Sequence, residues 1–195
     1  MNGDRRGSRG QATVEFGVSS IVLLLILLGL IDLGRAFYFA VGLTGATREG
    51  ARTASWYVPP DPNQAGSVGS NPKFDDADIK AAVDGMLANA GLPASVLENP
   101  AMTCPATADG NTLYDPPYAD SAYPSAAGQP QLYICYENTP GLDIASAPAD
   151  NRYNGVDVNV IVLMNFGFAS GYMQSAFGPS FHIVSNTHMT VGGGY

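Results

Sequence analysis

Basic residues are scarce over most of this chain of 195 residues. Residues 53–195 contain three basic side chains against thirteen carboxylates, which gives a net charge of −10. The three are Lys73, Lys80 and Arg152. Binding of nucleic acid depends on clustered lysine and arginine side chains that contact phosphates. We therefore expect no nucleic acid among the partners of this acidic region.

Residues typical of catalytic and metal sites are also few. The chain has two cysteines and two histidines, and it contains neither a phosphate-binding loop nor a dinucleotide fingerprint. The run Ala65-Gly66-Ser67-Val68-Gly69 lacks the first glycine of a nucleophile elbow. Asp75, Asp76 and Asp78 lack the order of a calcium loop and suit the capped start of a helix. We expect no enzyme, no metal and no cofactor, and a hydrolase outside the cytoplasm is the weaker alternative.

No charged residue occurs in residues 16–31. These 16 residues make about 24 Å of helix, which is short of the roughly 30 Å hydrocarbon core of a bilayer. A single-pass membrane helix must therefore include residues on either side of this run. Asp32 and Arg35 follow on one helix face and can neutralise each other as an ion pair. The basic side chains in front of the run hold that end in the cytoplasm and direct the rest of the chain outside; they are Arg5, Arg6 and Arg9.

A small residue precedes the apolar run, whereas a secretory signal peptide places its cleavage site after it. Cleavage after Gly10 would leave Gln11 as the first residue, Glu15 as the fifth and the apolar helix intact. This arrangement resembles that of prepilin peptidase substrates. Two stretches are similar to the TadE family: Gly10-Gln11-Ala12-Thr13-Val14-Glu15-Phe16 and Leu43-Thr44-Gly45-Ala46-Thr47-Arg48-Glu49-Gly50-Ala51-Arg52.

TadE-like proteins are pilin-like components of tight-adherence (Tad or Flp) pilus machinery. The resemblance implies processing by prepilin peptidase between Gly10 and Gln11, and assembly through Glu15 and Phe16 with other pilin-like subunits and Tad assembly proteins. In pilin-like proteins the glutamate at this position meets the α-amino group of a neighbouring subunit, which cleavage exposes. The resemblance further implies residence in the bacterial cytoplasmic membrane, with incorporation into the pilus as a further option. Main filament subunits of the family are usually much shorter, which favours a minor subunit acting in pilus assembly and adhesion.

Two interpretations compete with this one. In the first, Glu15 reaches the cytoplasmic interface beside Arg9, and the helix is an ordinary anchor. In the second, the leader is retained and the protein is an unprocessed, membrane-anchored binding module outside the cytoplasm. The surface for such binding would be a proline-rich loop whose tyrosines are Tyr114, Tyr118 and Tyr123. An inert solvated loop is the alternative at these positions.

Cys104 and Cys135 enclose that loop, and both fall in the part expected outside the cytoplasm. An oxidising compartment allows them to form a disulfide, and the family resemblance favours one. Two free buried thiols are the alternative.

The chain is expected to divide into a cytoplasmic leader (1–10), a transmembrane and stalk helix (11–55) and an extracytoplasmic α+β domain (56–195). Apolar residues recur at helical spacing as far as Ala54, and Pro59-Pro60 ends the helix. Small residues such as Gly42, Gly45 and Gly50 allow close packing, either on neighbouring pilin-like helices or on the domain itself.

The domain is predicted to contain a small antiparallel sheet and one further helix. Alternating or aromatic patterns predict strands at 131–136, 155–168 and 181–191, and the helix begins near Asp76 and ends at Gly91. In the middle strand the face that carries Val158, Val160 and Val162 is expected to turn toward the helices. Residues 192–195 are expected to be disordered.

Overall fold

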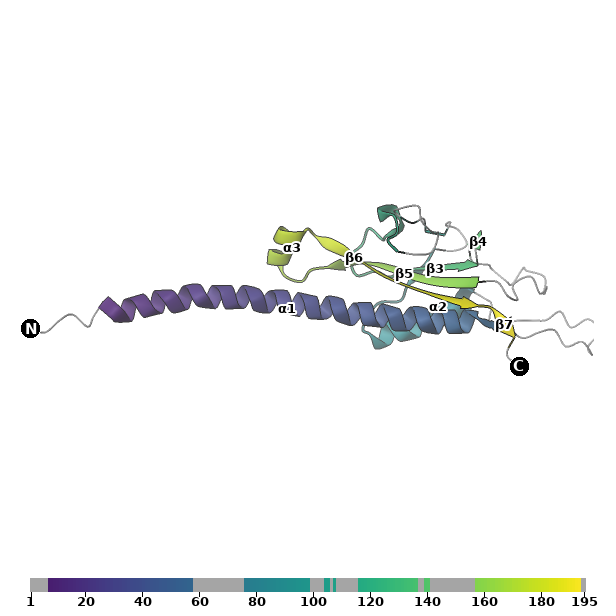
Figure 1. Cartoon of the computed structure of the whole chain (residues 1–195), viewed down its shortest axis with the longest axis horizontal. Coiled ribbons are helices and arrows are strands. Elements are labelled where there is room, and N and C mark those ends of the chain that lie inside the picture. The colour runs from purple at the N-terminus through teal and green to yellow at the C-terminus, as the bar shows by residue number, and fades with distance from the viewer. Residues whose placement is uncertain are drawn as a thin grey trace, which may run out of the picture.

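A single helix forms the long axis of the molecule. The computed structural model describes residues 7–57, 76–98, 104–105, 107, 116–136, 139–140 and 157–193. Helix α1 (Gly7–Ala54) has 48 residues, which corresponds to about 72 Å. It runs this far because no proline interrupts it. Its first half projects alone, and its second half lies along the domain (Figure 1).

The domain is built on one mixed sheet, so the α+β prediction is confirmed. The strands are β2 (Val96–Leu97), β3 (Gln131–Tyr136), β5 (Asp157–Gly167) and β6 (Ser180–Thr190), in that spatial order, with β4 (Thr139–Pro140) paired to β3. The β3–β5 and β5–β6 pairs are antiparallel as predicted. Strand β2 joins β3 in parallel, so the expectation of a purely antiparallel sheet was wrong at this edge. A two-residue strand carries too short a pattern for the sequence to reveal it.

Two helices cover one face of the sheet. Helix α2 (Asp76–Asn89) packs with α1 on this face (Figure 1). Residues of both helices share one core cluster with the valine face of β5, as predicted: Val158, Val160, Val162, Met164 and Phe166. A buried hydroxyl chain also ties α1 to β6, because Thr47 lies 3.0 Å from both Ser185 and Thr187. The domain is thus attached along the second half of α1.

The other face of the sheet is covered by the chain around the disulfide. Tyr118 and Ala122 pack with Ile161 and Leu163 of β5 in a second buried cluster. A 3₁₀ turn, η1 (Asp120–Ala122), lies in this cover, and the Ala122 carbonyl accepts a hydrogen bond from the Tyr133 hydroxyl at 3.1 Å. The expectation of an exposed loop is therefore wrong for Tyr118 and Ala122, which are buried. An aliphatic sheet face needs a cover, and tyrosine rings supply it where the loop has few aliphatic residues.

Two more elements depart from the sequence expectations. Helix α3 (Gly171–Phe177) forms between the last two predicted strands, where no helix is expected, so the described part of the domain has two further α-helices instead of one. Strand β7 (Gly192–Gly193) pairs in parallel with β1 (Trp56–Tyr57), so the expected disorder is wrong for these two glycines. Backbone pairing requires no side chain, and a glycine pair therefore gives no sequence signal for it.

The small residues of α1 face the protein's own helix α2. A Cβ atom on Gly42 would lie 2.6 Å from the Cβ atom of Ala90, and one on Gly50 would lie 2.6 Å from Val83 Cγ2 and 3.1 Å from Val160 Cγ1. Real Cβ atoms do not approach other atoms this closely, so α2 and the sheet occupy the space that glycine leaves. Of the two packing partners expected for these glycines, the structure thus shows the protein's own domain.

Gly50→Ala should destabilise the domain. Overpacking costs about 1–3 kcal/mol, more than the gain of up to about 1 kcal/mol in helix propensity. Gly85→Ala in α2 is the matched control, because a Cβ atom there meets nothing within 4 Å, and it should stabilise. Thermal unfolding of the full-length protein in nanodiscs measures both. Equal stabilisation by the two variants would contradict the close contact at Gly50.

Candidate anchor and assembly site

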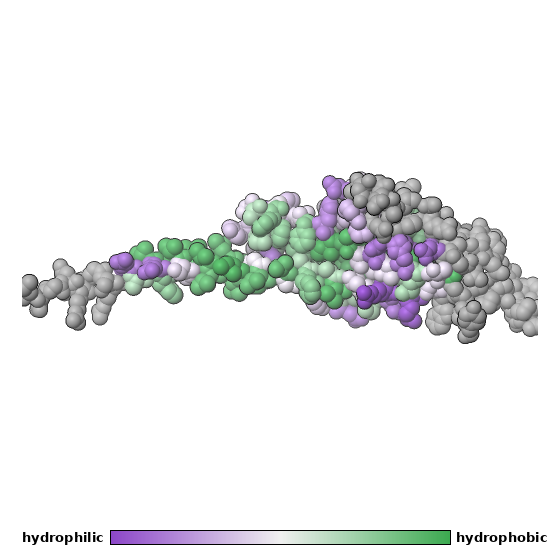
Figure 2. All heavy atoms as spheres, in the orientation of Figure 1, coloured by the Kyte–Doolittle hydropathy of each residue, from purple (hydrophilic) through white to green (hydrophobic). Residues whose placement is uncertain are grey.

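The first half of α1 is an apolar rod that the rest of the described chain does not cover. From Val14 to Ile31 its large apolar side chains are exposed or half-exposed, and the most exposed ring is that of Phe16, at 74%. Figure 2 shows this surface as a continuous apolar stretch. Among the described residues one helix is long and apolar enough to cross a membrane, and none of its most apolar window is buried. So much uncovered apolar surface requires an environment other than water.

The residues expected to serve processing and assembly lie at the start of this rod. Gly10, Gln11, Glu15 and Phe16 are all exposed within α1. No ion pair of Glu15 occurs among the side chains that the structure describes, and the side chain of Arg9 is not among these. The structure therefore leaves Glu15 accessible for contacts with another chain.

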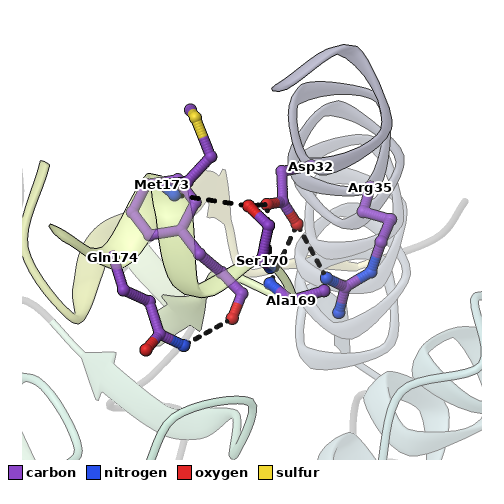
Figure 3. A network of polar contacts seen from close by, with 7 residues as sticks. Asp32, Arg35, Ala169, Ser170, Met173 and Gln174 are labelled. Carbon is purple, nitrogen blue, oxygen red and sulfur yellow. Dashed lines mark hydrogen bonds and ion pairs between the residues drawn. The ribbon is translucent and has the colours of Figure 1, made fainter. Parts of the chain in front are cut away.

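Asp32 ends the apolar run and is almost completely buried, with a side chain only 1% exposed. Arg35 donates to its carboxylate at 3.2 Å, which is the pair expected from the sequence. The carboxylate also accepts hydrogen bonds from the Ala169 amide (2.9 Å), the Ser170 amide (3.2 Å) and the Ser170 hydroxyl (2.7 Å). Figure 3 shows these contacts, which we call the Asp32 cluster. Four donors offset the cost of burying the charge.

The segment that meets Asp32 is ordered by its own capping contacts. Ser170 is the N-cap of α3 and accepts a hydrogen bond from the Met173 amide at 3.4 Å. Gln174 donates its side-chain amide to the Phe168 carbonyl at 2.9 Å. The turn between β5 and α3 is thereby shaped to direct two amides at Asp32 (Figure 3). No pattern in the sequence indicates this contact, because 137 positions separate Asp32 from Ala169.

Arg35 adds an aromatic contact to the cluster. Its guanidinium carbon lies 5.3 Å from the ring centroid of Phe166 and 5.9 Å from that of Phe39. Both distances suit a cation–π interaction. The side chain of Arg35 is 41% exposed, so it lies at the edge of the cluster. The Asp32 cluster thus joins α1, the end of β5 and the start of α3.

The residues expected to form a contact loop are placed differently. Cys104 and Cys135 form a disulfide, with sulfurs 2.14 Å apart. Tyr118 is 2% exposed, so the expectation that its ring contacts partners is wrong. Tyr123 is half-buried and stacks on His182 at 3.8 Å; burial raises the pKa of its hydroxyl, and the Asp120 charge adds to this. Tyr114 lies outside the described residues.

Metal binding finds no support in the described part of the chain. No group of three or more histidine, cysteine, aspartate or glutamate side chains that could hold an ion occurs there. His182 Nδ1 lies 3.8 Å from the Asp120 carboxylate and has its ring against Tyr123. This histidine therefore serves a packing role in the second cluster.

Residues 10–52 match the family model described as TadE-like protein. The matched segment covers the uncovered half of α1, the Asp32–Arg35 pair and the glycines that contact α2. Comparisons with curated proteins and with solved structures found no match. The family resemblance expected from the sequence is confirmed over this segment.

Asp32→Asn should loosen the attachment of α3. The neutral side chain loses charge-assisted hydrogen bonds, so amides 169–174 should exchange faster, with a local opening free energy lower by about 2 kcal/mol. Hydrogen exchange of the full-length protein in nanodiscs measures this change.

Glu49→Gln is the control, since Glu49 and Arg52 have the same spacing but lie in water. The hydrogen bond and charge of Arg52 lower the pKa of the Glu49 carboxyl, yet an exposed pair contributes little. The control should leave amides 169–174 unchanged. Equal exchange in Asp32→Asn and the wild type would contradict the role of the cluster.

Proposed function

We propose that this TadE-like chain is a minor pilin-like subunit of a Tad (Flp) pilus system that acts in pilus assembly and adhesion. In this proposal prepilin peptidase removes residues 1–10, residues 11–55 form the membrane and stalk helix, and residues 56–195 form the domain outside the cytoplasm. The observation that carries the proposal is the uncovered apolar half of α1 with one accessible carboxylate, Glu15, at its start. The TadE-like match over residues 10–52 supports it.

Glu15 has the assembly role in this proposal. A carboxylate at the edge of a hydrocarbon core is costly unless it finds a cation or a donor. Cleavage after Gly10 creates a positive α-amino group on Gln11, and in an assembly of parallel helices the amine of one subunit can reach Glu15 of the next. Processing and assembly are then coupled, because the cation exists only after cleavage. Phe16, beside Glu15, offers its exposed ring to the same neighbour.

The positive charges near the N-terminus set the orientation of the helix in the membrane. Arg5, Arg6 and Arg9 resist transfer across the membrane, so the N-terminus stays in the cytoplasm and the domain lies outside the cytoplasmic membrane. The disulfide between Cys104 and Cys135 agrees with this placement, since disulfides persist in oxidising compartments. The role is structural: the family consists of pilus components, and the proposal assigns no enzymatic activity to the domain.

The surface left for other pilin-like helices is the side of α1 that faces away from α2. Above the apolar run it presents Phe37 and Val41, which are strongly exposed, and then Arg48. A shallow hollow on α1 lies along these residues, next to Ala40, Thr44 and Gly45, and it reaches the edge of α2, because a Cβ atom on Gly45 would lie 3.3 Å from Met86 Cε. A neighbouring helix can pack there while α2 stays in place. The unprocessed binding module receives less support, because Tyr118 is buried and Tyr123 is half-buried.

Processing is tested by the intact mass of the protein extracted from membranes. Cells with an active prepilin peptidase should yield a chain that starts at Gln11, and cells without it should yield the full chain. Gly10→Leu should block the cut, because the peptidase requires a small residue before it, and Gly17→Leu in the same helix is a control that should be processed normally. A full-length chain in peptidase-positive cells would contradict the proposal and support the unprocessed module.

Glu15→Ala should abolish incorporation into the pilus assembly while membrane insertion is retained. Assembly is lost because the substitution removes the acid. Insertion is retained because the span becomes more apolar. Crosslinking to other pilin-like subunits and a count of pili measure assembly, and membrane fractionation measures insertion. Glu49→Ala is the control, because it removes a carboxylate of α1 far from the apolar run. Normal piliation with Glu15→Ala would count against the ion-pair role.

A further inference from the structure

The tip of the domain around α3 carries exposed apolar rings. Phe177 is 70% exposed, Tyr172 49% and Phe181 39%. Outside α1, the described residues include only two other large apolar side chains that are exposed, Met86 and Val96. Among the described residues of the domain, apolar exposure is therefore concentrated at one end. Figure 2 shows apolar surface on α3 above the apolar half of α1, and Figure 1 shows α3 as the element of the domain nearest the N-terminus.

The segment that forms this tip has no formally charged side chain of its own. No aspartate, glutamate, lysine or arginine occurs in residues 158–195, although the whole region 53–195 has a net charge of −10. Bacterial membranes carry anionic lipids, so an acidic surface would be repelled from them. A segment without acidic side chains lowers that repulsion, although the Asp120 carboxylate lies 3.8 Å from His182 of β6. The rings of the tip and its tyrosine hydroxyl are the groups that favour the boundary between lipid and water.

The structure fixes the tip at a definite level along α1. The Asp32 cluster holds residues 169 and 170 beside the end of the apolar run. Within that run, a Cβ atom on Gly29 would lie 3.7 Å from Met173 Sδ. A hydrocarbon core of about 30 Å, counted from Phe16, needs about 20 residues and so extends to about Arg35. Helix α3 therefore lies beside a part of α1 that is at or within the outer lipid boundary.

We propose that α3 and its exposed rings insert into the outer lipid–water interface, as a second membrane contact beside the α1 span. The inference rests on the proposed membrane anchor. The occupant is lipid, because the apolar surface of the tip is continuous with the span and lies at its level. The Asp32 cluster then lies at the lipid–water boundary, where the Arg35 side chain, 41% exposed, can reach water while the Asp32 carboxylate stays buried. Two contacts restrict how far the domain can tilt about the end of the span.

Tryptophan reporters test the depth of the tip in vesicles of phosphatidylethanolamine and phosphatidylglycerol with brominated acyl chains. The full-length Trp56→Phe protein serves as background, and Phe177→Trp and Phe181→Trp are the two tip reporters. Leu24→Trp reports the span, and Met86→Trp reports a site beside Gly45, about 24 Å further along α1 than Gly29. Both tip reporters should be quenched several-fold more than Met86→Trp and should emit at shorter wavelength.

The outcomes separate the tip from the anchor. Quenching of Leu24→Trp with water-like emission from Phe177→Trp and Phe181→Trp would overturn the lipid contact and leave the anchor intact. Shielding of the tip from aqueous iodide without quenching by brominated lipid would also overturn it, and would indicate a second copy or another protein at the tip. If Leu24→Trp is not quenched either, the anchor fails and the lipid contact fails with it.

Discussion

A buried carboxylate at the end of an apolar helix constrains the whole arrangement. Asp32 lies at the end of the apolar stretch of α1, and the stretch that carries the domain begins after it. A charge in this position is tolerated only when donors surround it, and three of its four hydrogen bonds come from residues 169 and 170. The domain is consequently attached to α1 at two levels. The Asp32 cluster holds the tip of the domain, and the face of α1 that carries Gly42 and Gly50 packs against α2 further along the helix.

These two attachments divide the surface of α1 between the protein itself and its neighbours. Gly42 and Gly50 approach Ala90 and Val83 too closely to admit another helix, so the face of α1 whose small residues favour helix packing is already occupied. Glycines on a pilin-like helix therefore do not by themselves indicate contacts between subunits. Phe37 and Val41 remain open, as do residues 10–28 of α1. The proposed contacts with other subunits are thus confined to the other side of the stalk and to the span.

Periodicity alone was enough to predict the long helix and the central strands, because α1 has no proline and β5 alternates over eleven residues. The same pattern could predict the pair of Asp32 with Arg35, three residues apart, but not the donors from Ala169 and Ser170, which only the fold brings there. The burial of Tyr118 was missed for a related reason. A proline-rich loop gives no sign of whether its rings face water or the bare side of a sheet, and here the disulfide holds them against the sheet. Short strands such as β2 carry no pattern at all.

If both proposals hold, the lipid contact of the tip restricts the position in the pilus at which Glu15 can pair with another subunit. While the tip rings lie in lipid, the subunit is tied to the membrane by α3 as well as by α1. Moving it into a filament would expose Phe177 and Tyr172 to water unless a neighbouring subunit buried them, and uncovered apolar area costs about 25 cal/mol per Å². In a filament made of many copies, each subunit would need a surface that buries the tip of its neighbour. A minor subunit at the base of the pilus needs none, because its tip can stay in the membrane while Glu15 engages the amine of the next chain. The two contacts together therefore favour a place at the membrane end of the assembly.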